Sequence, residues 1–545
     1  MQKLTYNFKT NMKYLVTSAL PYANAPLHLG HVLEIVQTDA WVRHKNLTKD
    51  EALYFCASDT HGTPIMLKAK DSGIQPEELI NKMHANHKNT FEKFNINLAN
   101  FHSTHSEENK ILTADIFKNA QDKGYIYKKN ISQLYDENEG IFLADRFVKG
   151  SCPVCKAEDQ YGDACEKCGS TYDALELINP ISALSDSTPI IKESEHYFFQ
   201  LNKLSDFLKS NIKKISKQPP IEAKLNEWLD EDLRDWDVSR DDPYFGFNIP
   251  GEDSKYIYVW MDAPVGYLAS IQNWSESLNN DFNDLMNSQD TKLIHFIGKD
   301  IVYFHLLFWP AMLKTAGIKN LDEVFVHGFL TIEGKKMSKS KGNFILADKA
   351  LDYAPADYYR YYLSSKLNTD ISDIDFSLDD FIQKVNSDLI GKYINIGSRT
   401  QNFLVKLNGS KIIPNSLTKS QEFKDNYVEI ISQIDAKEYS KALRNIMMLA
   451  DKINAYVSKE EPWDKAKNGN EEACLKICSE SLNVFKDLTI LLQSFIPEIT
   501  SEALSMLNLG KLSYSDLGLD NINSVQKFKP FIRRLEKTEF EGILD

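Results

Sequence analysis

Two short motifs, far apart in the chain, carry side chains suited to binding a polyphosphate. The first is His28-Leu-Gly-His31, with two imidazoles, and the second is Lys336-Met-Ser-Lys-Ser340, a lysine-rich stretch on a glycine-bounded loop. Imidazole and ammonium groups can donate to phosphate oxygens and stabilise charge that develops during displacement at phosphorus. We therefore expect His28, His31, Lys336 and Lys339 to be catalytic through positioning and electrostatics, without a covalent nucleophile.

Each motif follows a segment with strand character. Residues 14–20 form a short apolar run before the first motif, and residues 323–330 form another before the second. Apolar positions at helical spacing over residues 30–44 predict a helix that begins at the first motif. The histidines would then lie at a helix N-terminus, where free N–H groups and the helix dipole favour phosphate oxygens. Gly30, without a Cβ, would let a flat adenine ring approach the backbone.

The two motifs resemble the signatures of the class I aminoacyl-tRNA synthetases, with Leu29 where the first motif usually has isoleucine. Four further runs are similar to the methionyl-tRNA synthetases, and the resemblance extends over nearly the whole length of the chain. They are residues 19–24 (Ala-Leu-Pro-Tyr-Ala-Asn), 58–64 (Ser-Asp-Thr-His-Gly-Thr-Pro), 259–267 and 296–305. The resemblance implies that ATP activates L-methionine to methionyl-adenylate. The methionyl group then passes to the 3′ end of tRNA(Met), with release of AMP and pyrophosphate.

The resemblance also assigns roles to single residues. The implied ATP-binding residues are His28, Gly30, His31, Glu34, Asp300 and Lys339. Asp300 would hold the ribose, Glu34 would support the adenosine side, and Mg²⁺ would accompany ATP. The implied methionine-binding residues are Leu20, Tyr22, Asp59, Trp260, Ala263, Pro264, Tyr267, Ile301 and His305, with Arg240 orienting Asp59.

The chemistry of these residue types agrees with a methionine site. An amino-acid site needs a carboxylate for the α-ammonium, and Asp59 follows a strand-like run. Thioether sulfur is polarizable and accepts only weak hydrogen bonds, so it suits an apolar, aromatic slot with few donors. We expect the Leu20 N–H and the Tyr267 hydroxyl to be those donors. Homocysteine lacks only the methyl group and should be the hardest competitor, because one methylene gives only about 1–3 kcal/mol of discrimination.

Four of the seven cysteines have the spacing of a metal site. Cys152 and Cys155 form one C-x-x-C pair, and Cys165 and Cys168 form another nine residues later. Four thiolates leave no open coordination position, which indicates one structural Zn²⁺. Disulfides are the competing interpretation, but thiols in a chain without a secretory signal suit a reducing cytosol. The other three cysteines, Cys56, Cys474 and Cys478, fit ordinary core positions.

The order of segments predicts an α/β architecture: a doubly wound parallel Rossmann-like catalytic domain, interrupted by a zinc-binding insertion and followed by an all-α bundle. We place the catalytic halves at 1–120 and 235–355, the insertion at 121–234, a stem-contact linker at 356–390 and the bundle at 391–545. In the bundle, one stripe on a helix predicts a core face: Leu443, Ile446, Met447, Ala450 and Ile453. The resemblance implies that the bundle reads the anticodon through Asn395, Arg399 and Trp463.

Composition limits the setting of the protein. The chain has 545 residues, is 42% hydrophobic and carries a formal net charge of −14, which excludes a globally basic nucleic-acid binder but leaves local recognition of tRNA by shape and stacking. The most apolar segment, residues 301–313, is too short to span a bilayer. We expect a cytoplasmic monomer, without a membrane partner or a C-terminal dimerisation barrel, that charges initiator and elongator tRNA(Met). Residues 1–11 would be a dispensable extension.

Two other functions fit part of the pattern. An adenylyltransferase such as pantetheine-phosphate adenylyltransferase uses the same histidine quartet on a non-tRNA substrate, but the long helical C-terminal half and the methionine pocket disfavour it. A noncatalytic tRNA-binding module descended from a synthetase would have no need of His28, His31 and Lys339. A test for methionine-dependent exchange and tRNA charging separates all three.

Overall fold

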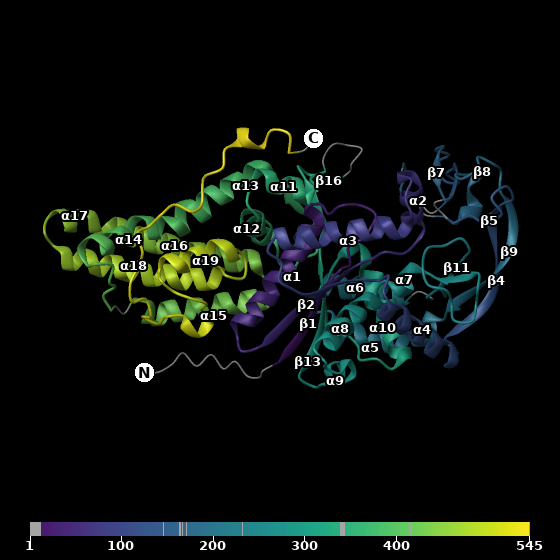
Figure 1. Ribbon diagram of the computed structural model, residues 1–545, viewed down its shortest axis with the longest axis horizontal. Coiled ribbons are helices and arrows are strands. Elements are labelled where there is room, and N and C mark those ends of the chain that lie inside the picture. Colours follow the sequence, from purple (N-terminus) through teal and green to yellow (C-terminus); the bar gives the residue numbers. More distant parts are fainter. Residues whose placement is uncertain are drawn as a thin grey trace.

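The computed structural model describes residues 12–144, 147–162, 165, 167–170, 172–230, 233–337, 344–414 and 417–543. Figure 1 shows an elongated molecule with a helical bundle at one end, a parallel sheet in the middle and an antiparallel insertion at the other end. In the part of the chain that the structure describes, no helix combines the length and apolar character needed to cross a membrane.

The central sheet has the strand order β14-β13-β1-β2-β3, and all its neighbours are parallel. Its strands are β1 (Lys13–Ser18), β2 (Glu51–Ser58), β3 (Leu98–Ser103), β13 (Thr291–Gly298) and β14 (Glu323–His327). Neighbouring residues face opposite sides, so that Leu15 joins one hydrophobic core and Val16 the other. Strands buried on both faces explain why the sequence reads as continuous apolar runs. The predicted doubly wound fold is confirmed.

Helices cover both faces of this sheet. They are α1 (Leu29–Leu47), α2 (Thr63–Ser72), α3 (Pro76–Lys93), α4 (Glu107–Asp122), α7 (Val259–Asp262), α8 (Val265–Ser277), α9 (Phe282–Asn287) and α10 (Trp309–Ala316). Helix α1 packs against β1 and β2, whereas α4, α8 and α10 pack together on the opposite side. The first histidine motif therefore begins a helix that is held firmly against the sheet.

The insertion is built on two long antiparallel strands, β4 (Ile126–Asp136) and β9 (Ile190–Phe199), in a sheet of order β10-β9-β4-β5. The other elements of this region are β5 (Ile141–Phe142), β6 (Val148–Ser151), β7 (Gln160–Tyr161), β8 (Ile178–Ser182), α5 (Ser205–Ile215), α6 (Pro219–Asp230), β10 (Trp236–Asp237), β11 (Ser239–Asp241) and β12 (Lys255–Ile257). The β7-β6-β8 sheet carries the cysteine pairs at the far end of the molecule (Figure 1).

After β14 the chain forms β15 (Leu330–Ile332), β16 (Lys335–Lys336), α11 (Ala347–Tyr353), α12 (Ala356–Lys366) and β17 (Ile374–Phe376). The bundle follows, with α13 (Leu378–Lys384), a π-helical stretch (Val385–Ile394), α14 (Asn395–Leu407), α15 (Gln421–Asp435), α16 (Tyr439–Glu460), α17 (Pro462–Lys467), α18 (Glu471–Leu492) and α19 (Pro497–Met506). The stripe predicted on α16 is buried at every position, as expected for a core face. The chain then returns across the bundle to α13 (Figure 1).

The catalytic sheet and the bundle share one hydrophobic core, which runs without a break from α1 to α18. At the end of α1, the Trp41 indole N–H donates to the Asp435 carbonyl at 3.2 Å and the Lys45 ammonium lies 2.5 Å from the Asp435 carboxylate. Arg360 of α12 is fully buried and donates to Asp39 of α1 at 2.6 Å and to the Phe495 carbonyl at 2.9 Å. Helix α1 thus contacts the histidine site at one end and the bundle at the other.

Candidate active site

A cavity of ≈ 720 Å³ opens where the parallel strands end. Leu20 follows β1, Asp59 follows β2, Asp300 follows β13 and His327 ends β14. Ligands of doubly wound sheets bind at this carboxyl edge. The predicted site residues that line the cavity are Leu20, Tyr22, His28, Gly30, His31, Glu34, Asp59, Arg240, Trp260, Ala263, Pro264, Tyr267, Asp300, Ile301 and His305.

The two histidines of the first motif cap α1. The Gly30 N–H donates to Nδ1 of His28 at 3.0 Å, and the His28 N–H donates to Nδ1 of His31 at 3.1 Å. Because each Nδ1 accepts a hydrogen bond, a neutral ring carries its proton on Nε2. Burial, together with His28 and His87, lowers the pKa of His31 well below its ordinary value, so this ring is neutral. The motif therefore presents imidazole N–H donors beside the helix N-terminus.

The second motif reaches the first through Met337. A Cβ added to Gly30 would lie 2.7 Å from Cε of Met337 and 2.8 Å from Cε1 of His28, so a larger residue here would displace these two side chains. Met337 also lines the cavity. Lys336 lies in β16, and the predicted role of Lys339 concerns a residue outside the described part of the chain.

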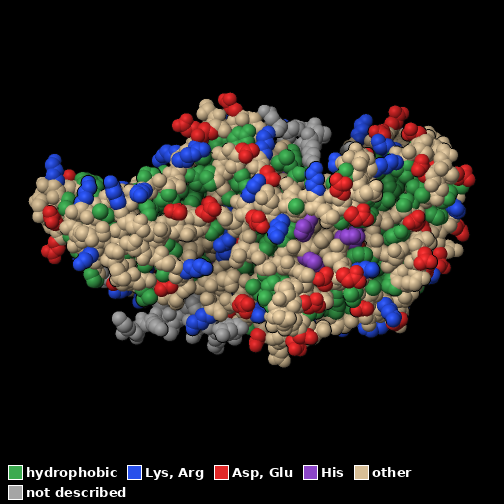
Figure 2. All heavy atoms as spheres, in the orientation of Figure 1, with side chains coloured by type: hydrophobic (Ala, Val, Ile, Leu, Met, Phe, Trp, Pro, Cys, Tyr) green, Lys and Arg blue, Asp and Glu red, His purple; other side chains and the backbone are tan. Residues whose placement is uncertain are grey.

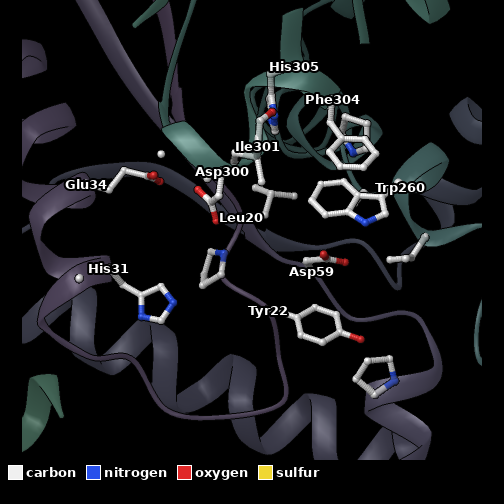
Figure 3. A pocket seen from close by; sticks show the side chains of 18 of the residues that line it. Leu20, Tyr22, His31, Glu34, Asp59, Trp260, Asp300, Ile301, Phe304 and His305 are labelled. Carbon is white, nitrogen blue, oxygen red and sulfur yellow. The ribbon is translucent and has the colours of Figure 1, made fainter. Parts of the chain in front are cut away.

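Glu34 and Asp300 extend their carboxylates toward each other at the side of the cavity next to α1 (Figure 3). The sequence interpretation missed the third member of this group, His327. Its Nε2 lies 3.0 Å from Oε2 of Glu34, and its Nδ1 lies 2.8 Å from the Gly328 carbonyl. A histidine at the carboxyl end of a predicted strand was the available signal, because that edge binds ligands in this fold.

Asp59 lies between Tyr22 and Trp260 in Figure 3. Backbone N–H groups of Thr60 and His61 stabilise its carboxylate, yet burial and the negative Asp262 raise its pKa well above the usual range. Oδ1 of Asp59 is buried and, among the described residues, has no hydrogen-bond partner. A buried carboxylate oxygen without a partner is costly. The site is thus suited to a ligand that brings a positive charge.

An aromatic wall forms the apolar end of the cavity. The rings of Trp260 and Phe304 are stacked, with centroids 3.8 Å apart and planes 6° apart (Figure 3). Phe304, which the sequence interpretation also missed, begins a π-helical stretch that runs to Phe308 and includes His305. Such stretches are frequent at functional sites. Phe304 gave no separate signal, because it lies in an apolar run that reads as ordinary core.

The proton of the Tyr267 hydroxyl is already engaged. Burial lowers the pKa of His305 to about 4, so the ring is neutral. Nδ1 of His305 lies 3.0 Å from the Ile301 carbonyl and must carry the proton, whereas Nε2 accepts from the Tyr267 hydroxyl at 2.7 Å. In this arrangement the Tyr267 hydroxyl donates to His305, and its donation to a ligand sulfur stays a prediction. The Leu20 N–H faces the oxygen of the same hydroxyl, and its donation to a ligand sulfur likewise stays a prediction.

Arg240 lies in β11 and lines the cavity. Its guanidinium carbon lies 3.7 Å from the centre of the Tyr258 ring, and its Nη1 donates to the Ser239 carbonyl at 2.6 Å. Nη1 also lies 3.5 Å from the Asp237 carboxylate. Stacking and flanking contacts of this kind hold a guanidinium plane in one orientation.

Comparison with known proteins agrees with this geometry. The family described as "tRNA synthetases class I (M)" matches residues 14–401, and the "Anticodon binding domain of methionyl tRNA ligase" matches residues 408–532. The chain is 47% identical to a methionine–tRNA ligase of Francisella tularensis subsp. tularensis over 98% of its own length and 80% of the relative's. The chain belongs to the methionyl-tRNA synthetases.

Solved structures agree in fold. A methionyl-tRNA synthetase of Mycobacterium tuberculosis in complex with methionyl-adenylate is 22% identical and superposes with a TM-score of 0.78, over 95% of this chain and 99% of that one. The free form of the Mycobacterium tuberculosis enzyme superposes with a TM-score of 0.72 over 97% and 99%. By its family matches and its 47% identical relative, this synthetase is a class I enzyme of the methionine–tRNA ligase type.

In the synthetase, the sulfur atoms of Cys152, Cys155, Cys165 and Cys168 all lie within 4.8 Å of one another. Two Sγ pairs are 3.5 and 3.9 Å apart, too far for disulfides. Zn–S bonds of about 2.3 Å place the sulfurs of a tetrahedron about 3.8 Å apart, so the cluster fits a metal ion. The predicted metal-ligand set is brought together, and the disulfide alternative is excluded for these cysteines.

The predicted anticodon residues of the synthetase form one group at the end of the bundle. The guanidinium carbon of Arg399 lies 5.1 Å from the centre of the Trp463 ring, and the Trp463 side chain is 37% exposed. Asn395 donates to Asn454 at 2.9 Å. Figure 2 shows lysine and arginine side chains along the end of the bundle that carries α14 and α17. An exposed indole beside an arginine can stack on an unpaired base.

Proposed function

We propose that the cavity activates L-methionine with ATP and that the enzyme then transfers the methionyl group to the 3′ end of tRNA(Met). The observation that supports this best is that groups suited to phosphate and groups suited to an amino acid line opposite sides of one cavity. The helix-capping histidines and Gly30 lie on one side, and Asp59 lies on the other, with an Oδ1 that no described residue hydrogen-bonds. A nucleotide triphosphate and an amino acid bound there would meet at the strand ends.

In the first step, the carboxylate of methionine attacks the α-phosphorus of ATP, and pyrophosphate leaves. We assign the binding of phosphate oxygens to the Nε2–H groups of His28 and His31 and to the N-terminus of α1. Lys336 and Lys339 would stabilise the charge that develops on the leaving pyrophosphate. Asp300 would hold the ribose and Glu34 the adenosine side. Mg²⁺ bound to the phosphates would supply further positive charge.

Methionine recognition would divide between the two ends of its pocket. Asp59 would bind the α-ammonium, with Arg240 as its orienting neighbour. The stacked Trp260 and Phe304 rings offer a polarizable apolar surface to the thioether, a type of contact that sulfur favours. The remaining predicted members, Leu20, Tyr22, Ala263, Pro264, Tyr267, Ile301 and His305, would shape the slot.

The helical region would recognise tRNA(Met) at its anticodon. Trp463 and Arg399 would stack with and hydrogen-bond to unpaired bases, and Asn395 would contribute a polar contact. Initiator and elongator tRNA(Met) share the anticodon, so both would be substrates. We propose that residues 1–120 and 235–355 form the catalytic domain and that residues 121–234 form the insertion. Residues 356–390 would be the stem-contact linker and residues 391–545 the helical anticodon-binding domain.

We propose that the cysteine cluster holds one Zn²⁺ with a structural role. Four thiolates complete a tetrahedron and leave no position for water, and backbone N–H groups of Val154 and Cys155 lie 3.4 Å from Cys152 Sγ. Thiolate ligands need a reducing compartment, so we place the enzyme in the cytoplasm, where we expect a monomer.

The function is tested by ATP–pyrophosphate exchange with each of the twenty amino acids, followed by charging of tRNA(Met). We expect exchange that depends on methionine, weak exchange with homocysteine, and full charging of both tRNA(Met) species. Exchange without any tRNA charging would contradict the proposal and would favour an adenylyltransferase. No exchange, with intact tRNA binding, would favour a noncatalytic tRNA-binding protein.

A further inference from the structure

A buried histidine of the insertion lies beside the segment that carries Arg240. His196 of β9 is 1% exposed, and each ring nitrogen faces a carboxylate. Nδ1 lies 2.8 Å from Oδ2 of Asp237, and Nε2 lies 2.9 Å from Oδ2 of Asp241. A neutral imidazole has only one N–H, so a ring that donates to both carboxylates is an imidazolium.

The other polar groups around the His196 ring come from two neighbouring strands. The amide nitrogen of Gln133, in β4, lies 2.6 Å from Nε2 of His196 and donates to the Asp241 carboxylate at 3.1 Å. A protonated Nε2 of His196 accepts no hydrogen bond, so beside an imidazolium this amide donates to Asp241 alone. Lys255 of β12 forms an ion pair with the other oxygen of Asp241. Lys129 is opposite His196 in the strand register, but its ammonium lies over a neighbouring phenylalanine ring. The His196 ring therefore pairs with two carboxylates, and one of them, Asp241, also pairs with Lys255.

The pKa directions agree with a charged ring. Burial opposes the charge on His196, but the hydrogen bonds that the ring donates to Asp237 and Asp241 outweigh burial and raise the pKa of His196 above its ordinary value. Burial also opposes ionisation of Asp241, yet His196 and Lys255 lower the pKa of Asp241 to about 2. The imidazolium is therefore favoured below the raised value and is lost as the pH rises through it.

Asp237 connects His196 to Arg240. The oxygen of Asp237 that accepts from His196, Oδ2, is also the one that lies 3.5 Å from Nη1 of Arg240. The backbone between them is fixed as well, because the Val238 N–H donates to the Tyr197 carbonyl at 2.9 Å. Two cations thus compete for one carboxylate oxygen, and His196 holds it at the shorter distance.

We propose that His196 is a positioning residue for methionine binding, because its imidazolium neutralises Asp237 and Asp241 and so leaves the guanidinium of Arg240 at the cavity. The inference rests on the proposed function of that cavity. Loss of one partner from a buried ion pair leaves an uncompensated charge. Without the imidazolium, Asp237 would draw Arg240 toward itself and away from the methionine site.

The first test compares His196→Gln with the parent enzyme in methionine-dependent ATP–pyrophosphate exchange. We expect the KM for methionine to rise by about tenfold and the KM for ATP to stay within about twofold, because only the methionine side loses a contact. His102→Gln is the matched control. That histidine also pairs with a carboxylate, Glu108 at 3.2 Å, but does not line the cavity, and its variant should behave as the parent.

The second test is the pH dependence of the methionine KM between about pH 6 and 9, a range that starts below the ordinary pKa of histidine. In the parent, the KM should rise as the imidazolium loses its proton. In His196→Gln, this component should be absent. The ammonium of methionine titrates equally in both experiments, so the difference between the two profiles reports the protein.

The third test is rescue. In His196→Gln/Asp237→Asn, the carboxylate that would attract Arg240 is gone, and the methionine KM should fall back toward the parent value. A purely structural role predicts further damage instead. Equal rises in both KM values, failure of rescue or an unchanged pH profile would overturn the inference. If His196→Gln does not fold, a flat methionine KM in the parent across this range would do the same. A parent without methionine-dependent exchange would refute the proposed function itself.

Discussion

Nε2 of His327 lies 3.0 Å from Oε2 of Glu34, and both side chains are buried at the nucleotide side of the cavity. Nδ1 of His327 is engaged by the Gly328 carbonyl at 2.8 Å and must carry a proton. A hydrogen bond between Nε2 and Glu34 then needs a second proton. Burial raises the pKa of Glu34, and Glu34 raises the pKa of His327 against the opposing effect of burial. In this geometry the pair therefore holds one shared proton.

Loss of this shared proton should weaken ATP binding. Because the pKa of His327 is raised, the proton is present below the raised value and is lost as the pH increases through it. A bare carboxylate would then face a ring lone pair, and we expect the KM for ATP to increase at alkaline pH. Glu34→Gln supplies an amide N–H at every pH and should flatten this profile. Parallel profiles for parent and variant, measured by pyrophosphate exchange, would contradict the shared proton.

Lys339→Ala tests the second signature motif. We expect slower formation of methionyl-adenylate, because the transition state loses roughly 2–4 kcal/mol of stabilisation, whereas methionine affinity should be nearly unchanged. Rapid-quench measurement of a single turnover reports the rate, and equilibrium dialysis reports the affinity. Equal single-turnover rates for the variant and the parent would remove Lys339 from the mechanism.

The cysteine cluster gives a prediction about metal content. Replacement of Cys152 and Cys155 by serine should release about one equivalent of zinc, since a site with two remaining thiolates binds weakly. Activation should fall indirectly as the insertion loosens. Cys474→Ser is the control, because that buried thiol lies in α18 and outside the cluster. Protein that contains no zinc by elemental analysis, or stays fully active after complete chelation, would show the assignment to be wrong.

Trp463→Ala should separate the two ends of the enzyme. The substitution removes a stacking surface worth roughly 1–3 kcal/mol per base, so tRNA(Met) charging should fall by one to two orders of magnitude. Methionine adenylation should be nearly unchanged. Asp59→Ala should do the reverse, abolishing adenylation while tRNA still binds. Met448→Ala, at another exposed apolar position of the bundle, serves as the control. Equal damage to exchange and charging, with a lower Tm, would identify Trp463 as a core residue.

The features that the sequence predicted best are those with a local pattern. The histidine motif sits at the start of α1 because apolar spacing and helix-capping chemistry are both local, and the cysteine spacing determines a tetrahedral cluster. Phe304 and His327 were missed, because their neighbours in sequence give no sign of what lies across the cavity. The sequence also could not predict that the Tyr267 hydroxyl donates to His305. That donation depends on the His305 tautomer, which the Ile301 carbonyl fixes.

Helix α1 has a consequence for how the molecule can be cut. Its first residues cap the cavity, and its last turns lie against α15 and α16, where Trp41 and Lys45 meet Asp435. A fragment that ended after the parallel sheet would expose this indole to water and strip Lys45 of its closest carboxylate. The smallest autonomous methionine-activating unit must therefore include helices that never touch methionine. Insertions and deletions should be tolerated at the zinc-bearing tip long before they are tolerated between α14 and α16.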